Sequence, residues 1–293
     1  MTIDLDHIVG IDTHVHAEID DHGHTALPQD FLDASAKYFK AGERTPTIAQ
    51  IGERYRALRL AAVIFTVDAE KKLGHQRISN EDVVAGAAEF PDVFIPFASI
   101  DPAKGADGAA ELRELIADKG IRGLKLHPSL QEFAPNDGSA FGLYEVLAEH
   151  RLPVVFHTGQ TGIGAGMPGG GGIKLRYSDP MLIDDVCADF PDLTVIMAHP
   201  SIPWQDAAIS IVTHKPNAYI DLSGWSPKYF PPQLVRAMNG LLRRKMLFAT
   251  DNPVIDPERW MSDFEALELK DGVRELVMKD NAARILGLVK EES

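Results

Sequence analysis

Residues 7–16 have the sequence HIVGIDTHVH, a short apolar run that ends in two histidines separated by one residue. Its apolar part is continuous rather than alternating, which is typical of a strand buried on both faces. Residues i and i+2 of a strand point to the same face, so His14 and His16 can reach one ion. A second pair, His22 and His24, lies in an acidic segment that contains glycine, where a solvated loop is expected.

Seven further apolar runs follow, with helical patterns between them, such as residues 106–119 and 232–242. This alternation of strand and helix predicts a parallel sheet covered by helices. Eight strands fit a closed (β/α)8 TIM barrel, and a doubly wound open sheet is the alternative. The seven runs are residues 61–67 (AAVIFTV), 93–99 (VFIPFAS), 121–126 (IRGLKL), 152–156 (LPVVF), 193–198 (LTVIMA), 218–222 (AYIDL) and 246–250 (MLFAT).

The 293 residues are predicted to form a single barrel domain over residues 1–293, since α/β barrels use about 250 residues as one unit. Two segments are longer than the usual strand-to-helix connections: residues 17–50, after the first strand, and residues 158–179, after the fifth. Both would lie at the carboxyl ends of the strands, where active sites of barrels occur. We therefore expect these long loops to act as lids or to bind substrate.

The chain has 29 basic and 43 acidic residues and a formal net charge of −14. This charge argues against nucleic acid and anionic membranes as partners and favours a small-molecule substrate. It leaves room for a locally basic pocket and an anionic substrate. The N-terminus, MTIDLDHIVG, has acidic residues where a secretory signal has lysines, and no stretch approaches about 18 apolar residues. A soluble, cytoplasmic protein is expected.

Cys187 is the one cysteine of the chain, so an intramolecular disulfide is excluded, in keeping with a reducing cytosol. Its neighbours, VCADF, have the pattern of a helix. A small buried hydrophobic residue is favoured over a catalytic thiol.

Polar residues that can bind metals follow three more of the predicted strands. His157 follows LPVVF, His199 follows TVIMA and Asp251 follows MLFAT. Each alone could be a capping or packing residue. Together with His14 and His16 they lie at the same end of the first, fifth, sixth and eighth strands, and in a closed barrel these ends converge. Burying such groups without a partner costs about several kcal/mol, so their clustering predicts a site for a cation.

The sequence resembles the amidohydrolase superfamily. More narrowly, it is similar to the amidohydrolase-related branch that includes aminocarboxymuconate semialdehyde decarboxylase and resorcylate-type decarboxylases. The order and spacing of the matching stretches, over nearly the whole chain, are more specific than any single stretch. These stretches are IDTHVH, GLKLHP, VVFHTG, IMAHP, YIDLSGWSPKYFPP, LFATDNP and NAARILGL.

This resemblance implies that His14, His16, His157 and Asp251 bind one divalent metal ion. Zinc is the expected ion and manganese the alternative, because imidazole and carboxylate ligands suit both. The resemblance also implies that His199 lies beside the bound water or substrate as a general acid or base. Asp251 could also take a proton from that water.

Lys125 and His127, in GLKLHP, lie at the end of the fourth strand and can both face the barrel axis. Some members of the superfamily use a carboxylated lysine at this place to bridge two metals. A second metal bound through Lys125 is the less favoured hypothesis, and a lysine paired with a carboxylate under the site is the alternative. His127 is a candidate for substrate contact.

Residues 159–177 have the sequence GQTGIGAGMPGGGGIKLRY. Its glycines allow backbone N–H groups to approach a ligand, and Lys174 and Arg176 supply positive charge beside them. We hypothesise that this loop holds an anionic part of the substrate, such as a carboxylate or the phosphates of a coenzyme A thioester. The alternative is a lid whose glycines serve only flexibility.

Three aromatic residues follow the sixth and seventh strands. Trp225 and Tyr229, after the seventh strand, could wall an aromatic substrate, and Trp204, after the sixth, is similarly placed. Aromatic residues that pack loops together are an equal alternative for each of them.

The favoured function is that of a metal-dependent hydrolase. The combination of HTGQTGIGAGMPGGGGIKL with LSGWSPKYFPP resembles proteins of aromatic degradation described as hydroxyphenyl β-ketoacyl-CoA hydrolases. The alternatives are a non-oxidative decarboxylase of a hydroxylated aromatic or enoic acid and a catalytically silent metal-binding scaffold. The branch that the chain resembles often forms dimers or larger assemblies, so a homo-oligomer is expected.

Overall fold

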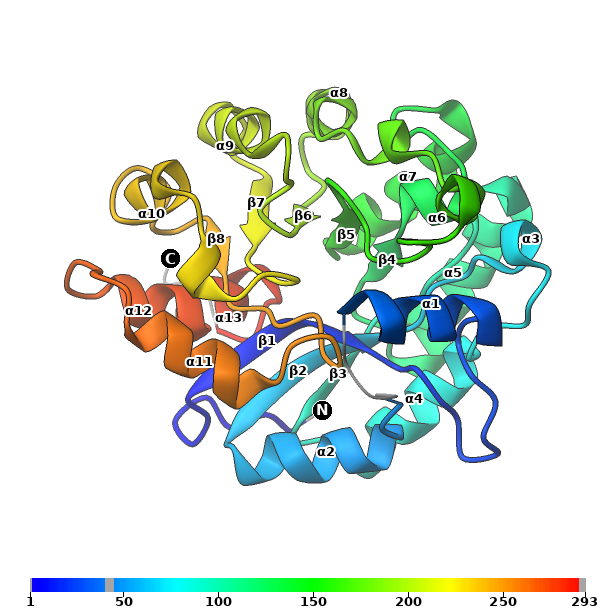
Figure 1. Cartoon of the computed structure of the whole chain (residues 1–293), viewed down its shortest axis with the longest axis horizontal. Helices are drawn as coiled ribbons and strands as arrows, with labels where there is room; N and C mark the ends of the chain where they lie inside the picture. The colour runs from blue at the N-terminus through cyan, green and yellow to red at the C-terminus, as the bar shows by residue number, and fades with distance from the viewer. Residues whose placement is uncertain (1, 40–44, 290–293) are drawn as a thin grey trace.

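The computed structural model describes residues 2–39 and 45–289. Eight parallel strands occupy the centre of the molecule and helices surround them, which confirms the predicted (β/α)8 barrel (Figure 1). The strands are β1 (Gly10–His16), β2 (Leu60–Phe65), β3 (Phe94–Pro96), β4 (Leu124–Leu126), β5 (Val154–His157), β6 (Val195–Ala198), β7 (Ala218–Asp221) and β8 (Met246–Leu247).

Two parallel sheets make up the barrel wall, one of β1 to β3 and one of β4 to β8. Isolated bridges join them at both seams: Ala98 pairs with Leu124, and Val15 pairs with Asn252. At the second seam the backbone N–H of Asp251 donates to the carbonyl of His14 at 3.0 Å. The wall is therefore closed, and the open-sheet alternative is excluded.

Helices follow the strands and cover the outside of the barrel (Figure 1). Within the described residues, no helix has both the length and the apolar composition needed to cross a membrane. The helices are α1 (Gln29–Phe39), α2 (Ile48–Ala57), α3 (Glu70–Leu73), α4 (Asn80–Glu89), α5 (Gly105–Lys119), α6 (Pro128–Gln131), α7 (Phe141–His150), α8 (Met181–Asp189), α9 (Gln205–His214), α10 (Pro232–Met238), α11 (Pro257–Glu265), α12 (Val273–Glu275) and α13 (Asn281–Ile285).

The near-continuous apolar runs are explained by two separate apolar layers. Val63 and Val155 belong to a cluster with other inward-facing strand residues, whereas Ile64 and Phe156, their chain neighbours, pack in the larger cluster beneath the helices. Because successive strand residues point to opposite faces, a strand between two apolar layers needs apolar residues at almost every position.

β1 begins and ends three or four residues later than the apolar run at residues 7–12 predicted. The strand continues through polar residues because the barrel satisfies their hydrogen bonds. Asp12 accepts hydrogen bonds from the backbone of His14 and Thr250 and from the hydroxyls of Tyr55 and Thr250, at 2.6–3.1 Å. This carboxylate ties β1 to the end of β8 directly below the predicted site.

The two long connecting segments contain local structure of their own. Residues 17–50 include α1 and the start of α2, and residues 40–44 lie outside the described residues. In the other segment, residues 169–172 are glycines with φ between 61° and 77°. A Cβ on Gly171 would lie 2.9 Å from the ring of Phe31 in α1. These glycines thus allow a left-handed backbone, and Gly171 also allows close packing against α1.

Cys187 lies in α8 and is 2% exposed, within the apolar layer beneath the helices. Burial raises the pKa of its thiol to about 12. Because the thiolate is the reactive form, we expect native protein to react with iodoacetamide at pH 8 at least about 100-fold more slowly than urea-unfolded protein. Mass spectrometry of both samples over time measures this ratio, and equal rates would show that the thiol is accessible.

Candidate metal centre

Three atoms that can bind a metal ion, two from β1 and one from the segment after β8, converge at the carboxyl end of the barrel. His14 Nε2 lies 3.2 Å from His16 Nε2 and 3.2 Å from Asp251 Oδ1, and His16 Nε2 lies 3.1 Å from the same oxygen. Two ligands of a tetrahedral ion with bonds of about 2.05 Å are about 3.3 Å apart. The three atoms are therefore spaced as ligands of one small ion would be.

The chemistry of this donor set also fits a cation. His14 Nδ1 donates to Asp221 Oδ2 at 2.9 Å, so the neutral imidazole has a lone pair on Nε2. That lone pair faces the carboxylate oxygen of Asp251 at 3.2 Å. Two electron-rich atoms at this distance repel each other unless positive charge lies beside them; Lys125 Nζ, 3.0 Å from His14 Nε2, supplies part of it, and a metal ion between the two atoms would supply more.

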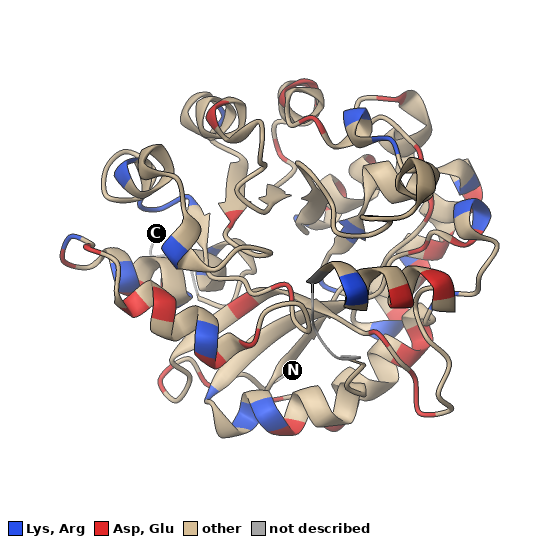
Figure 2. Ribbon diagram, viewed as in Figure 1, with Lys and Arg blue, Asp and Glu red and all other residues tan. Residues whose placement is uncertain are grey.

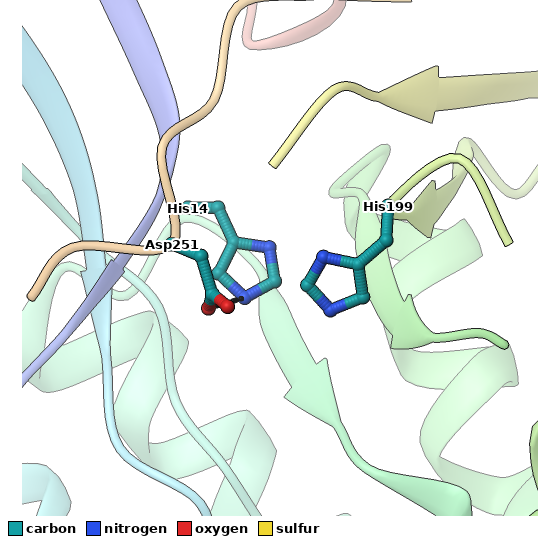
Figure 3. A group of neighbouring side chains, drawn as sticks. All are labelled: His14, His199 and Asp251. Carbon is teal, nitrogen blue, oxygen red and sulfur yellow. Dashed lines mark ion pairs between the residues drawn. The ribbon is translucent and has the colours of Figure 1, made fainter. Parts of the chain in front are cut away.

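His157 and His199 complete the cluster. His157 Nδ1 lies 2.9 Å from His199 Nε2. His157 Nε2 is buried and has no hydrogen-bond partner within the described residues, whereas Nδ1 is the ring atom that faces His199. Figure 3 shows the His199 imidazole facing His14 and Asp251, and these three residues offer ligand atoms that lie within 4.8 Å of one another.

The protonation states suit ligation as well. Burial is the largest cause that lowers the pKa of His157 and His199, and it lowers that of His14 to about 3, with a further contribution from the charge of Lys125. Burial would raise the pKa of Asp251, but His14 and His16 lower it below its ordinary value. At neutral pH these histidines are neutral and the carboxylate is ionised, which are the forms that bind metal.

His199 and Asp251 both follow their strands with left-handed backbone, at φ 71° and 65°. This conformation is uncommon for residues with a Cβ and costs about 1–3 kcal/mol each. Hydrogen bonds hold it, because His199 N donates to Asp221 Oδ1 at 3.1 Å and Asp251 N to the carbonyl of His14 at 3.0 Å. The strained backbone aims both side chains at the cluster.

Asp221 in β7 is a site residue that sequence reasoning missed. Its Oδ2 holds His14 Nδ1, and its Oδ1 accepts from the backbone of His199 and the hydroxyl of Ser223. Burial opposes ionisation, but His14 lowers the pKa of the Asp221 carboxyl below its ordinary value. A carboxylate in the otherwise apolar run AYIDL was the available signal.

Replacing Asp221 with asparagine is expected to weaken metal binding by about 10- to 100-fold, because His14 loses the carboxylate that fixes its tautomer and ring orientation. Competition with a chelator measures the affinity. The surface variant Asp206→Asn is the matched control. An unchanged affinity in a folded Asp221→Asn protein would contradict this role.

Lys125 is fully buried, and its Nζ lies 3.0 Å from His14 Nε2 and 4.9 Å from the centre of the Phe65 ring. Burial lowers the pKa of the Lys125 ammonium to about 8. No carboxylate within the described residues forms an ion pair with it. The expected pairing with a carboxylate is therefore replaced by contact with a histidine of the cluster.

A pocket of about 580 Å³ opens above the cluster, and His16, His157, His199 and Asp251 are part of its wall. Charged residues are concentrated on the surrounding helices and loops (Figure 2), and much of the pocket wall is apolar. Its apolar wall includes Leu32, Leu73, Leu130, Ile163, Leu175 and Trp225.

The other predicted substrate-binding residues differ in their positions. His127 and Trp225 line the pocket, whereas Lys174 and Arg176 are outside its wall. Lys174 forms an ion pair with Glu132, and the guanidinium of Arg176 lies 4.8 Å from the Tyr177 ring centre. Both cations therefore contact neighbouring loop residues and do not line the pocket.

The remaining predicted positions lie away from the pocket wall. Trp204 and Tyr229 are outside it, and Tyr229 is exposed. In the second histidine pair, the backbone N–H groups of His22 and His24 both donate to Asp20 Oδ1 at 2.8 Å. The expected loop is present there.

Known proteins with this fold include enzymes of several activities. An uncharacterised TIM-barrel protein from Bordetella bronchiseptica is 25% identical to the chain, with a TM-score of 0.78, over 95% of this chain and 98% of that chain. No curated protein matches the sequence.

Two further solved structures resemble the chain in fold. A 5-carboxyvanillate decarboxylase from Novosphingobium aromaticivorans, solved with bound manganese, is 10% identical (TM-score 0.67, covering 98% of this chain and 99% of that chain). A probable 2-pyrone-4,6-dicarboxylic acid hydrolase from Acinetobacter baumannii is 16% identical (TM-score 0.62, covering 96% and 100%).

The amidohydrolase family model matches residues 11–288, from the first strand to the last helix. This match spans all the residues of the cluster and agrees with the resemblance stated from the sequence motifs. The chain belongs to the amidohydrolase family and is a metal-dependent enzyme.

Proposed function

We propose that the protein is a hydrolase that uses one divalent ion, held by His14, His16, His157 and Asp251. The convergence of His14 Nε2, His16 Nε2 and Asp251 Oδ1 within 3.2 Å of one another carries this proposal. The position of His157 Nδ1, 2.9 Å from His199 Nε2, supports His157 as the fourth ligand. Zinc is the preferred ion for this set and manganese the alternative.

A divalent ion in this place would lower the pKa of water and polarise a carbonyl oxygen of the substrate. Side chains of the protein would then accept and donate the protons that the reaction transfers. Asp251 is ionised, and no hydrogen bond to its Oδ2 is found within the described residues, so this oxygen is free to accept a proton from water. His199 lies beside it in the pocket wall and would hold or return a proton during the reaction.

The pocket favours a substrate with an apolar, aromatic end. Its wall includes leucine, isoleucine and tryptophan side chains beside polar and charged ones such as Glu18 and Arg77, and its volume of about 580 Å³ is suitable for a small aromatic acyl group. We propose an aryl β-ketoacyl thioester as the substrate. The thioester's longer part would leave through the mouth of the pocket.

In the proposed reaction, the oxygen of water forms a bond to the β-keto carbon. The bond between that carbon and the α-carbon breaks, and its electron pair goes to the enolate of the departing acetyl thioester. Protonation of the enolate at carbon gives the acetyl thioester, and the aromatic part leaves as a carboxylate. No oxidant or second substrate is needed.

The test compares two substrate classes on the metal-loaded protein: aryl β-ketoacyl-CoA thioesters and hydroxybenzoic acids. The proposal predicts formation of an aromatic acid and acetyl-CoA from the first class, measured by liquid chromatography with mass spectrometry. Release of carbon dioxide from the second class, with no thioester cleavage, would identify a decarboxylase instead. Stoichiometric metal without turnover of either class would favour the scaffold alternative.

A further inference from the structure

We propose that His127 is a catalytic hydrogen-bond donor, and that its Nε2–H binds the substrate oxygen that gains negative charge as the carbon–carbon bond breaks. This inference rests on the proposed function, since it assigns a residue to the second carbonyl of a β-ketoacyl substrate.

The backbone of α6 determines the tautomer of His127. His127 follows β4 and is the N-cap residue of α6, where its Nδ1 accepts a hydrogen bond from the backbone N–H of Leu130 at 3.3 Å. An Nδ1 that accepts carries no proton, so the proton of the neutral ring is on Nε2. The opposite edge of the imidazole is thereby fixed as a donor.

That donor has one weak acceptor within the described residues. Thr161 Oγ1 lies 3.5 Å away, at the outer limit of a hydrogen bond, and also accepts from the backbone N–H of Ile163 at 3.1 Å. His127 is 2% exposed, and both His127 and Thr161 line the pocket. A buried donor left in this way is costly unless a ligand in the pocket supplies the acceptor.

The His127 ring also lies next to the reacting region. It stacks on the ring of His157 with a centroid distance of 3.9 Å and an interplanar angle of 7°. His157 is the proposed fourth metal ligand, so the donor is one ring away from the metal cluster. A substrate with one carbonyl at the cluster would therefore present its neighbouring oxygen toward His127 and Thr161.

The chemistry of the proposed reaction needs such a donor. When the bond between the β-keto carbon and the α-carbon breaks, the carbonyl oxygen of the thioester becomes an enolate oxygen. A fixed donor that meets this charge stabilises the transition state more than the substrate, which raises kcat rather than lowering KM. Loss of one such donor typically lowers kcat by about 10²- to 10³-fold.

Two substitutions separate the donor from the helix cap. His127→Asn keeps a side-chain acceptor near the position of Nδ1 but removes the Nε2 donor. His127→Gln places an amide donor near the position of Nε2 and disturbs the cap. We expect His127→Asn to lower kcat by about 10²- to 10³-fold with little change in KM, and His127→Gln to keep kcat within about tenfold of wild type.

The controls distinguish loss of the donor from loss of metal or of folding. Metal content and melting temperature are measured for every variant, and His150→Asn, an exposed histidine at the end of α7, should match wild type. If His127→Asn does not fold, His127→Ser, which also provides a capping side chain, replaces it. Equal kcat for wild type and the cap-preserving variant, or a larger loss in His127→Gln than in His127→Asn, would overturn the inference.

A binding measurement tests the donor without thioester turnover. 1-Phenylbutane-1,3-dione has the same pair of carbonyl oxygens, and its enolate is distinguished from its enol by ultraviolet absorbance. Wild type and His127→Gln should bind the enolate about 10- to 100-fold more tightly than His127→Asn. Equal affinities, or no binding by wild type, would overturn the role of His127. Failure to cleave thioesters, with this difference in affinity intact, would overturn only the proposed substrate.

Discussion

Replacing Asp251 with asparagine is expected to lower kcat/KM by about 10³-fold or more. The change removes the negative charge that faces His14 and His16, and it removes the oxygen proposed to accept a proton from water. General-base catalysis alone contributes about 10²- to 10⁴-fold, and loss of a ligand charge adds to this. Steady-state kinetics on substrates that wild type turns over, together with metal content, measure the effect.

The control for this variant is Asp271→Asn, which makes the same chemical change on the exposed turn before α12. It should match wild type in both metal content and rate. An Asp251→Asn protein that keeps more than about a tenth of the wild-type rate would show that this carboxylate neither binds the ion nor carries a proton.

Replacing His199 with glutamine is expected to lower kcat by about 10²- to 10⁴-fold while the bound metal per chain changes little. This outcome distinguishes a proton-transfer role from a ligand role, because His199 contacts His157 and Ser223 but is not among the four proposed ligands. Elemental analysis and a pH–rate profile are the measurements. Loss of the ion together with the activity would instead assign His199 to the metal.

The fold could be predicted because its cause is local and repeated. Each strand lies between two apolar layers, so each one left a continuous apolar run such as VVF or VIM in the sequence. The ends of the strands were less predictable. In β1, the polar Asp12 can be buried because its carboxylate accepts hydrogen bonds from the hydroxyls of Thr250 and Tyr55. Such partners are distant in sequence and leave no local pattern.

The cluster could be predicted for a related reason: His157, His199 and Asp251 directly follow the apolar runs VVF, VIMA and MLFAT, and parallel strands bring these ends together. Loop contacts could not be predicted. Lys174 pairs with Glu132, which follows α6, and nothing near either residue in the sequence indicates that pairing. Asp221 was missed because the strand pattern conceals a carboxylate whose partner, His14, lies 207 residues away.

The closing seam between β1 and β8 makes the site a product of the whole chain. Asp12 and Thr250, which fasten that seam, are 238 residues apart, so their contact forms only after most of the polypeptide exists. Contacts of such long range form slowly during folding. A nascent or truncated chain that ends before β8 has no Asp251 to complete the cluster. Uptake of the proposed ion would thus require a chain that extends past β8 and a closed barrel, and it should stabilise only such molecules.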